Sequence, residues 1–389
     1  MLVASPVLTD VRVVREAVAL AEAGHDVDVV GRDVPASPSP PGLRVWGATG
    51  GHGLRAGPRE PVAPATGAGG RLRRSARWAL LPEHRLRTFL RWRREAGQVA
   101  RRLAFDVVHA HDYTALVVGA RLARERGVPL VYDAHELWGA RHRSGRPTPV
   151  LDRWQRRQER RLGRRAVLVL TVGELLATRL RDIHGWRDVR VVRNTFPATD
   201  SMVPLPAAPA AAVYAGRLAA GRDLATVAAA SCSSGVELRL VGPRDASWAA
   251  AFDPLGAVVR AAVEPTRVDD ELRAAGLALV TLEDGWGNHR VALPNKLFQA
   301  VAAGVPVVAS DVGELARTVR RHDLGTLYTP GNAASLVLAL EHARARYAEL
   351  RRSVVAAQDV LGWPADRARL LGAYDELASA TRQRDGAAA

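Results

Sequence analysis

Short apolar runs rich in β-branched residues alternate along the chain with longer stretches in which apolar residues recur at helical spacing. This alternation is typical of parallel sheets whose faces are covered by helices. In the first half of the chain, the pattern predicts strands at residues 2–5, 27–31, 43–46, 107–110, 130–133, 167–172 and 189–193, and helices over 11–23 and from near 113, 149 and 173. In the second half, it predicts strands at 213–216, 237–242, 277–282 and 305–310, and helices over 223–230, 294–303 and 363–380.

Two such series in one chain indicate two domains. Residues 197–212 contain four prolines and little periodicity, which predicts a linker that also serves as a hinge. A chain of 389 residues, 48% of them hydrophobic, is long enough to bury two cores. We therefore expect an α/β fold with two Rossmann-like domains, residues 1–197 and 198–364, which face each other across a cleft. Ligands of such folds bind at the carboxyl ends of the strands.

The net positive charge of the chain lies in its first half. The formal net charge is +15, and residues 1–200 alone hold 35 arginines against 20 acidic residues. The single cysteine, Cys232, excludes a disulfide framework and fits a reducing compartment, and we expect it to be buried. No apolar run of about 18 residues is present, so we expect a cytoplasmic protein. The segment 34–70, rich in Pro and Gly, is expected to be the least ordered part.

Two arginine-rich runs stand out within the basic half. Residues 71–102 hold 11 arginines, two glutamates and several large apolar residues, and residues 141–165 hold ten arginines and two acidic residues. Such a basic amphipathic pattern predicts contact with an anionic membrane surface, chiefly through residues 71–102. A solvated helix face in an arginine-biased chain explains the pattern equally well. Nucleic acid is the least favoured partner because no nucleic-acid-binding motif accompanies the arginines.

The densest chemical signal lies at residues 292–310, where a helix preceded by Pro294 leads into an apolar strand. The start of a helix at the rim of a sheet favours an anion because its amides are free and its dipole end is positive. Lys296, the only lysine of the chain, adds a full charge one turn into this helix, and Gln299 follows on the same face. A second anion-binding feature is the turn after the strand at 213–216, which carries Arg217 and Arg222.

At these motifs the sequence resembles the retaining nucleotide-sugar glycosyltransferases of the GT-B architecture, family 4. The resemblance extends over nearly the whole chain. It rests on residues 10–17, 23–25, 109–113, 132–137, 171–174 and 192–194, on the Gly-Arg turn and on the Pro-Asn-Lys helix. It implies that a C-terminal helix, residues 365–380, packs back on the N-terminal domain.

The resemblance also implies that the second domain binds a nucleoside diphosphate sugar, most simply a UDP- or GDP-linked one. The catalytic cations would be Arg217, Arg222 and Lys296 on the diphosphate. The remaining donor contacts would come from Gly216, Asn288, His289, Pro294, Asn295, Leu297 and Gln299. The chain departs from the family at two positions, because Gln299 and Val291 stand where relatives have glutamates. The glutamate at the position of Val291 would contact the sugar hydroxyls, and here Asn288 or His289 would have to make that contact.

In the first domain, the resemblance places a catalytic histidine at His111, facing the donor sugar and the acceptor. The acceptor side would further include Asp10, His135, Glu136 and Asn194. No cofactor and no metal site are expected. Asp26 and Asp28 have the spacing of a metal-binding Asp-x-Asp motif, but they lie on the same solvent-facing side of a predicted strand.

The expected function is therefore transfer of a sugar with retention, without a metal, to a polysaccharide, lipid-linked or small-molecule acceptor. Two alternatives remain. The loss of both family glutamates favours a catalytically silent GT-B protein that binds only a nucleotide or a partner. The basic first half leaves a nucleic-acid-binding protein as the less favoured alternative.

Overall fold

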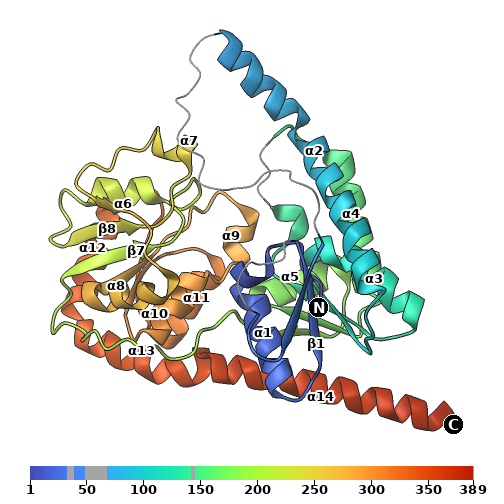
Figure 1. The fold of residues 1–389 in the computed structure, drawn as a ribbon. Coiled ribbons are helices and arrows are strands. Elements are labelled where there is room, and N and C mark those ends of the chain that lie inside the picture. Colours follow the sequence, from blue (N-terminus) through green and yellow to red (C-terminus); the bar gives the residue numbers. More distant parts are fainter. Residues whose placement is uncertain (33–38, 49–67, 142–144, 389) are drawn as a thin grey trace. The chain divides into compact units, whose positions relative to one another are not determined.

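The computed structural model describes residues 1–32, 39–48, 68–141 and 145–388. The structure forms two units, which Figure 1 shows as a ribbon. Unit 1 consists of Met1–Val172, Leu176–Val192 and Arg369–Ala389, and unit 2 consists of Gly173–Leu175 and Arg193–Ala368. The boundary thus falls five residues before the expected residue 197, and the segment 197–212 belongs wholly to unit 2.

Unit 1 contains a parallel sheet in two parts. Strands β3, β4, β5 and β6 pair in that order, β1 pairs with β2, and single bridges from Leu2 to Val30 and to Ala110 join the two parts. The strands are β1 (Val27–Gly31), β2 (Leu43–Gly47), β3 (Val108–His111), β4 (Leu130–Ala134), β5 (Leu168–Thr171) and β6 (Val189–Val191). The helices are η1 (Val7–Thr9), α1 (Val11–Glu22), α2 (Ala68–Ala100), α3 (Asp112–Arg126), η2 (Trp138–Ala140), α4 (Pro149–Gly163) and α5 (Glu174–His184).

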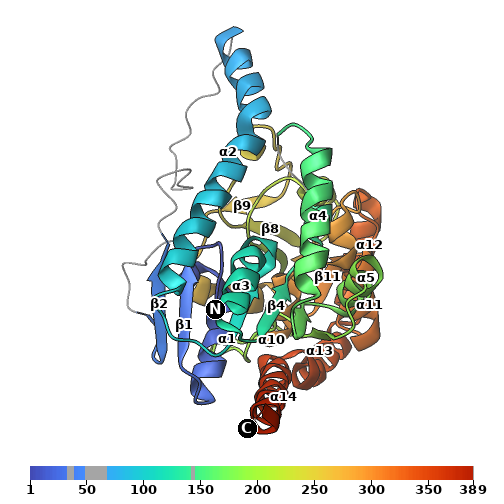
Figure 2. The ribbon, with the colours of Figure 1, turned by 90° about the vertical axis from the view of Figure 1, so that its right-hand side faces the viewer.

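Helices cover both faces of this sheet. Gly119 of α3 packs against Ala110 of β3, while His109, the neighbour of Ala110, faces Tyr374 on the other side. Seen from the side in Figure 2, α2, α3 and α4 lie together on one face. α3 packs on both α2 and α4.

Unit 2 is built on one six-stranded parallel sheet with the order β12-β11-β10-β7-β8-β9. Its strands are β7 (Ala211–Ala215), β8 (Glu237–Val241), β9 (Val258–Arg260), β10 (Gly276–Val280), β11 (Val307–Ser310) and β12 (Gly325–Tyr328). Its helices are α6 (Leu224–Ala230), α7 (Ala246–Ala249), η3 (Pro265–Arg267), α8 (Val268–Ala275), α9 (Gly287–Val291), α10 (Asn295–Ala302), α11 (Gly313–His322), α12 (Ala333–Ala345) and α13 (Tyr347–Leu361).

One core of unit 2 lies between the sheet and α8, α10 and α11, and a second lies between the sheet and α6 and α12. The last helix, α14 (Trp363–Ala388), begins in unit 2 and belongs to unit 1 from Arg369 onward. Among the described residues, no helix is long and apolar enough to cross a membrane.

Most of the predicted elements are confirmed to within about two residues, but three expectations were wrong or incomplete. Residues 2–5 do not form a strand, because only Leu2 makes bridge contacts. Cys232 is exposed, not buried. Two groups of elements in unit 2 were not predicted: α7, β9, η3, α8 and α9 before α10, and α11, β12, α12 and α13 after β11. The expected loop at 34–70 contains β2, and its residues 34–38 and 49–67 lie outside the described residues.

Candidate active site

The amino end of α10 is the first candidate site, and it lies in unit 2. Pro294 precedes the helix in an extended conformation and supplies no side-chain cap. The amide of Leu297 already donates to the carbonyl of Pro294 at 3.0 Å. The amide of Leu297 is therefore engaged within the helix, and the amides of Asn295 and Lys296 are those at the helix start without an intrahelical acceptor. That Leu297 contributes to donor binding stays a prediction.

Lys296 lies directly on the end of β7. Its Nζ is 4.7 Å from the centroid of the Tyr214 ring. Gly216 follows the strand with φ +148°, and a Cβ added there would lie 2.6 Å from Cε and 2.7 Å from Nζ of Lys296. Only glycine leaves room for the ammonium group at this place. Burial, and to a lesser degree the charge of Arg222, lowers the pKa of Lys296 to about 8.

Arg222 is the second cation near this position, and its turn is held by two contacts. Glu283 accepts a hydrogen bond from the amide of Gly221 at 3.2 Å. The Trp286 ring packs against Gly221 so closely that a Cβ there would lie 2.5 Å from the ring. Neither Arg222 nor Lys296 forms a salt bridge with any carboxylate of the described residues. The two cations therefore leave an uncompensated positive charge at the end of β7.

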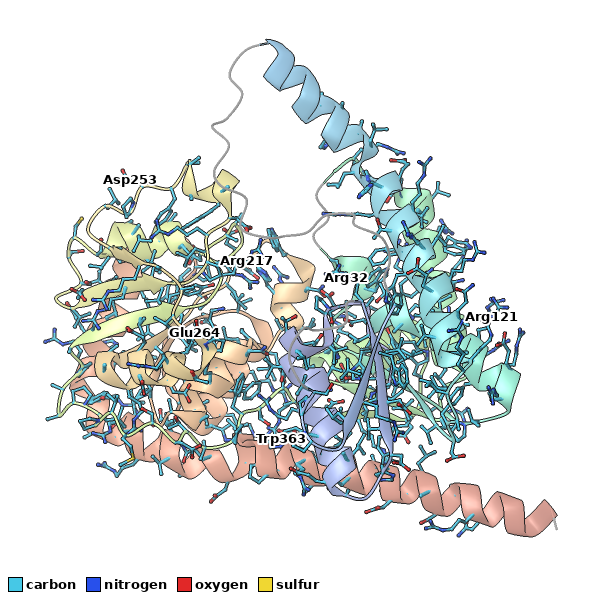
Figure 3. All side chains as sticks on the ribbon, in the orientation of Figure 1. Arg32, Arg121, Arg217, Asp253, Glu264 and Trp363 are labelled. Carbon is cyan, nitrogen blue, oxygen red and sulfur yellow. The ribbon has the colours of Figure 1, made fainter. Side chains whose placement is uncertain are left out.

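Arg217, the third predicted cation, is arranged differently. It forms an ion pair with Asp245, and its side chain is 64% exposed. Figure 3 shows it in unit 2, beyond the end of β7. Arg217 thus differs from Lys296 and Arg222 in having a carboxylate partner, and the prediction that all three bind the diphosphate stays a prediction.

The remaining residues predicted to bind the donor lie on α10 or in and near α9. Gln299 lines the same small void of about 10 Å³ as Lys296, so the two side chains share a face of α10 as predicted. His289 is buried, and its Nδ1 lies 2.6 Å from the carbonyl oxygen of Glu283. Its side chain therefore contacts the backbone of the loop that precedes it. Val291 is part of the apolar core. Asn288 is half-buried. It is therefore better placed than His289 to replace the glutamate that relatives have at the position of Val291.

Asn194 was expected on the acceptor side, and that role stays a prediction. It belongs to unit 2, where its Nδ2 donates to Oδ1 of Asn295 at 2.9 Å. The β6-to-β7 connection starts in unit 2 directly after Val192, which the sequence pattern did not reveal. Asn194 therefore supports the start of α10.

A cluster of buried charged and imidazole groups forms a second candidate site, in unit 1. Asp133, the fourth residue of β4, is at its centre. Arg12 of α1 binds this carboxylate through both oxygens, with Nε–Oδ2 at 2.7 Å and Nη2–Oδ1 at 2.8 Å. His111 and His135 each place a ring nitrogen on Oδ2, at 3.1 and 2.9 Å. Burial raises the pKa of Asp133, but Arg12 and the two histidines outweigh burial and hold it well below its usual range.

His111 does not face open space, contrary to the prediction. Its side chain is fully buried, and it stacks on His109 with ring centroids 4.4 Å apart. Burial lowers the pKa of His111, although Asp133 opposes this, so its imidazole is neutral at pH 7. With Nδ1 donating to Asp133, Nε2 is the acceptor nitrogen and lacks a hydrogen-bond partner.

His135 is the histidine that reaches the surface of this cluster, with 20% of its side chain exposed. It lies between Asp133 and Asp112, whose Oδ2 is 3.4 Å from His135 Nδ1. Burial lowers the pKa of His135, but the two carboxylates outweigh it and raise the pKa to about 10. The exposed imidazole is therefore a cation at neutral pH.

Two further side chains, those of Glu16 and Tyr374, contact this cluster. Glu16 of α1 lies 2.9 Å from Arg12 Nη2 and 3.9 Å from Nε2 of His109. Burial raises the pKa of Glu16, with Arg12 opposing. The hydroxyl of Tyr374 in α14 lies 2.8 Å from Nδ1 of His109.

The ligand atoms of Glu16, His109, His111 and Asp133 lie within 4.8 Å of one another, close enough to hold a metal ion. A metal does not fit well, because Asp133 already accepts four hydrogen bonds and Arg12 supplies the positive charge.

The two other predicted acceptor-side residues have structural partners. Asp10 caps α1 by accepting from the amide of Val13, and Ser5 donates to it at 2.8 Å. Glu136 pairs with Arg141 at 2.8 Å.

Sequence reasoning missed Arg12, Glu16 and Asp133 as members of the site. The signal for Arg12 and Glu16 was their i, i+4 spacing, which places two charged side chains on one face of a predicted helix. The signal for Asp133 was a carboxylate within an otherwise apolar predicted strand.

Comparisons with known proteins agree with this arrangement. Residues 10–198 match a family model described as Glycosyltransferase Family 4, and residues 211–345 match one described as Glycosyl transferases group 1. No curated protein matches the sequence significantly.

Solved structures are similar in fold at low sequence identity. Sucrose-phosphate synthase from Thermosynechococcus elongatus superposes with a TM-score of 0.70 at 19% identity, over 94% of this chain and 92% of that one. HepE from Anabaena, in complex with UDP and glucose, gives 0.64 at 17%, over 96% and 98%. The α,α-trehalose 6-phosphate synthase from Burkholderia multivorans gives 0.64 at 14%, over 98% of both. The two matched regions together with the shared fold identify the chain as a glycosyltransferase of the GT-B class.

Proposed function

We propose that this glycosyltransferase transfers a sugar from a nucleoside diphosphate sugar with retention of configuration. Unit 2 binds the donor, and unit 1 binds an acceptor that is a polysaccharide, a lipid-linked molecule or a small molecule. The observation that carries the proposal is the pair Lys296 and Arg222, two neighbouring cations without a carboxylate partner at the end of β7. A diphosphate is the ligand that would complete them.

The chemistry of the transfer follows from this charge. As the bond between the sugar carbon and the diphosphate breaks, negative charge grows on the leaving oxygen. Lys296, Arg222 and the amides of Asn295 and Lys296 stabilise that charge without reorganising, because they are already in place. The diphosphate takes the acceptor proton on the same face, so no carboxylate pair of the glycosidase type and no metal ion is invoked.

UDP is the nucleotide to test first. Three structures of similar fold are of HepE from Anabaena with UDP, with UDP and glucose, and with UDP-glucose. A GDP-linked donor is the second choice. A cytoplasmic location fits a nucleotide sugar donor and stays a prediction.

A thermal-shift series with UDP-, GDP- and ADP-sugars tests the donor, and NMR of the product anomer tests retention. We expect one nucleotide to raise the melting temperature and its sugar to be released or transferred with the anomeric configuration unchanged. An inverted product would contradict the retaining mechanism. Absence of any shift would contradict donor binding in unit 2.

One observation favours a second candidate, a protein that binds the nucleotide without turnover. Gln299 and the buried Val291 replace the two glutamates that relatives place on the ribose and the sugar. A neutral acceptor contributes about 0.5 to 1.5 kcal/mol where a charged one contributes about 1.5 to 3. A melting shift without sugar release would support this candidate, and the Gln299→Glu variant would then be expected to gain affinity.

A further inference from the structure

The outer face of α4 carries an unusual concentration of unpaired positive charge. Seven arginines on α4 and the two residues that follow it are exposed: Arg153, Arg156, Arg157, Arg160, Arg161, Arg164 and Arg165. None of them forms an ion pair with a described carboxylate, and the two acidic residues of α4, Asp152 and Glu159, are half-buried and buried. This face therefore presents a charge of +7 that the described part of the protein does not neutralise.

Large apolar side chains are exposed at the amino end of the same helix. Val150 is 82% exposed and Trp154 is 50% exposed. At helical spacing, Val150, Trp154, Arg157 and Arg161 follow one another along one stripe. The stripe thus changes from apolar to cationic along its length, while Leu162 on the opposite side is buried in the unit.

Helix α2 adds to this surface at the amino end of α4. Arg146, shortly before α4, donates from its amide to the carbonyl of Trp78 and from Nε to the carbonyl of Ala79, each at 3.0 Å. Trp78, 55% exposed, and the exposed Leu80 therefore lie beside the start of α4. Figure 2 shows α2 and α4 on the same face of unit 1, with α3 packed against both.

We propose that this surface, defined as α4 with residues 78–80 of α2, docks unit 1 onto an anionic lipid bilayer. Tryptophan and aliphatic side chains enter the interfacial region of a bilayer, and arginines along the same helix face meet acidic headgroups. Nucleic acid would explain the arginines but not an aliphatic side chain as exposed as Val150. The sequence pattern pointed chiefly to residues 71–102, whereas among the side chains that the structure describes α4 has the larger unpaired charge. The inference does not depend on the identity of the sugar donor.

Co-sedimentation of the full-length protein with vesicles tests the proposal. We expect binding to phosphatidylcholine vesicles that contain 30% phosphatidylglycerol, and little binding to pure phosphatidylcholine. A charge variant, Arg157→Gln/Arg160→Gln/Arg161→Gln, should weaken binding roughly 100-fold, because each basic residue near an anionic surface contributes about one factor of five. An anchor variant, Val150→Ser/Trp154→Ala, should weaken binding roughly ten-fold and reduce the quenching of tryptophan fluorescence by brominated lipid, with Trp78 accounting for the remainder.

Matched controls come from unit 2. The variant Arg321→Gln/Arg344→Gln/Arg352→Gln removes the same charge from exposed sites, and Leu338→Ser/Val355→Ser removes exposed apolar side chains. Both controls should bind like the unaltered protein, and circular dichroism should show all variants folded. Equal loss in the controls would overturn the proposal, as would equal binding to neutral vesicles or no binding at all. Capture of RNA or DNA in preference to anionic vesicles, lost in the charge variant alone, would also overturn it.

Discussion

The candidate sites of the two units differ in how their charges are partnered. In unit 1, the carboxylate of Asp133 is surrounded by Arg12, His111 and His135, and each charge has a partner within hydrogen-bond distance. In unit 2, Lys296 and Arg222 lie near each other and have no carboxylate partner among the described residues. Like charges brought together without compensation destabilise a fold unless a ligand removes the repulsion.

This difference indicates what each site is for. The Asp133 carboxylate of unit 1 has its charged partners within the unit, and the cluster leaves one imidazolium, His135, partly exposed. The cations of unit 2 are incomplete until an anion binds. Substitutions in unit 1 are therefore expected to act mainly on stability, and those in unit 2 mainly on ligand binding.

The largest effect is expected from Arg12→Leu. This change leaves the Asp133 carboxylate buried beside fewer partners, and breaking a buried ion pair from one side costs about 3 to 5 kcal/mol. Chemical denaturation should show the free energy of unfolding lowered by that amount. As a control, Arg44→Leu removes an exposed arginine that pairs with Asp28, and it should change stability little. Equal effects of the two changes would contradict the comparison.

The next effect is expected from Lys296→Ala, which removes a cation from the proposed diphosphate site. We expect kcat/KM to fall by an amount equivalent to about 2 to 4 kcal/mol in the transfer barrier, with stability unchanged or raised. The matched variant Lys296→Met keeps an apolar stem on the Tyr214 ring and should lose activity to the same degree. Full activity of Lys296→Met would show that the charge has no role.

Local patterns predicted the elements of both units well. The strands 27–31 and 237–242 and the helix 11–23 agree with β1, β8 and α1 to within a residue, because alternation and helical spacing are local properties. The strand expected at 2–5 failed for a non-local reason. Leu2 bridges Val30 and Ala110, Val3 donates to the carbonyl of Val30 and Ser5 accepts from Arg32, but these contacts do not form a regular ladder, and no pattern within five residues encodes that.

The site was predicted in part, and the failures arise from contacts between residues far apart in the sequence. Lys296 and Gln299 were placed on one face of a helix from their spacing alone, and the structure agrees. His111 was expected to be accessible, but Asp133, His135 and Glu16 enclose it from positions far apart in the sequence. Arg12 and His111 share the carboxylate of Asp133, which is 121 residues from Arg12, and single-sequence reasoning does not see such pairs.

A smaller effect is expected from pH. The pKa of Lys296 is lowered to about 8, so the ammonium form is complete below pH 7 and is lost as the pH rises through 8. Affinity for UDP should therefore fall between pH 7 and 9, and binding at pH 8 should take up a proton. Calorimetry in buffers of different ionisation enthalpy measures that uptake. The pH dependence should vanish in Lys296→Met, and its persistence there would assign it to another group.

The smallest effect is expected from Asp245→Asn, which frees the one predicted cation that the structure finds neutralised. Arg217 pairs with Asp245 at an exposed place, and such pairs contribute about 0 to 1 kcal/mol to stability, so the fold should be unaffected. If Arg217 turns to the diphosphate once released, affinity for UDP should rise up to about five-fold. Calorimetric titration measures this, with Asp284→Asn, which frees Arg290 at a similarly exposed pair, as the control. A fall in affinity would mean that the ion pair with Asp245 holds the turn in its binding conformation, and the positions of Arg217 and Arg222 would then be set together.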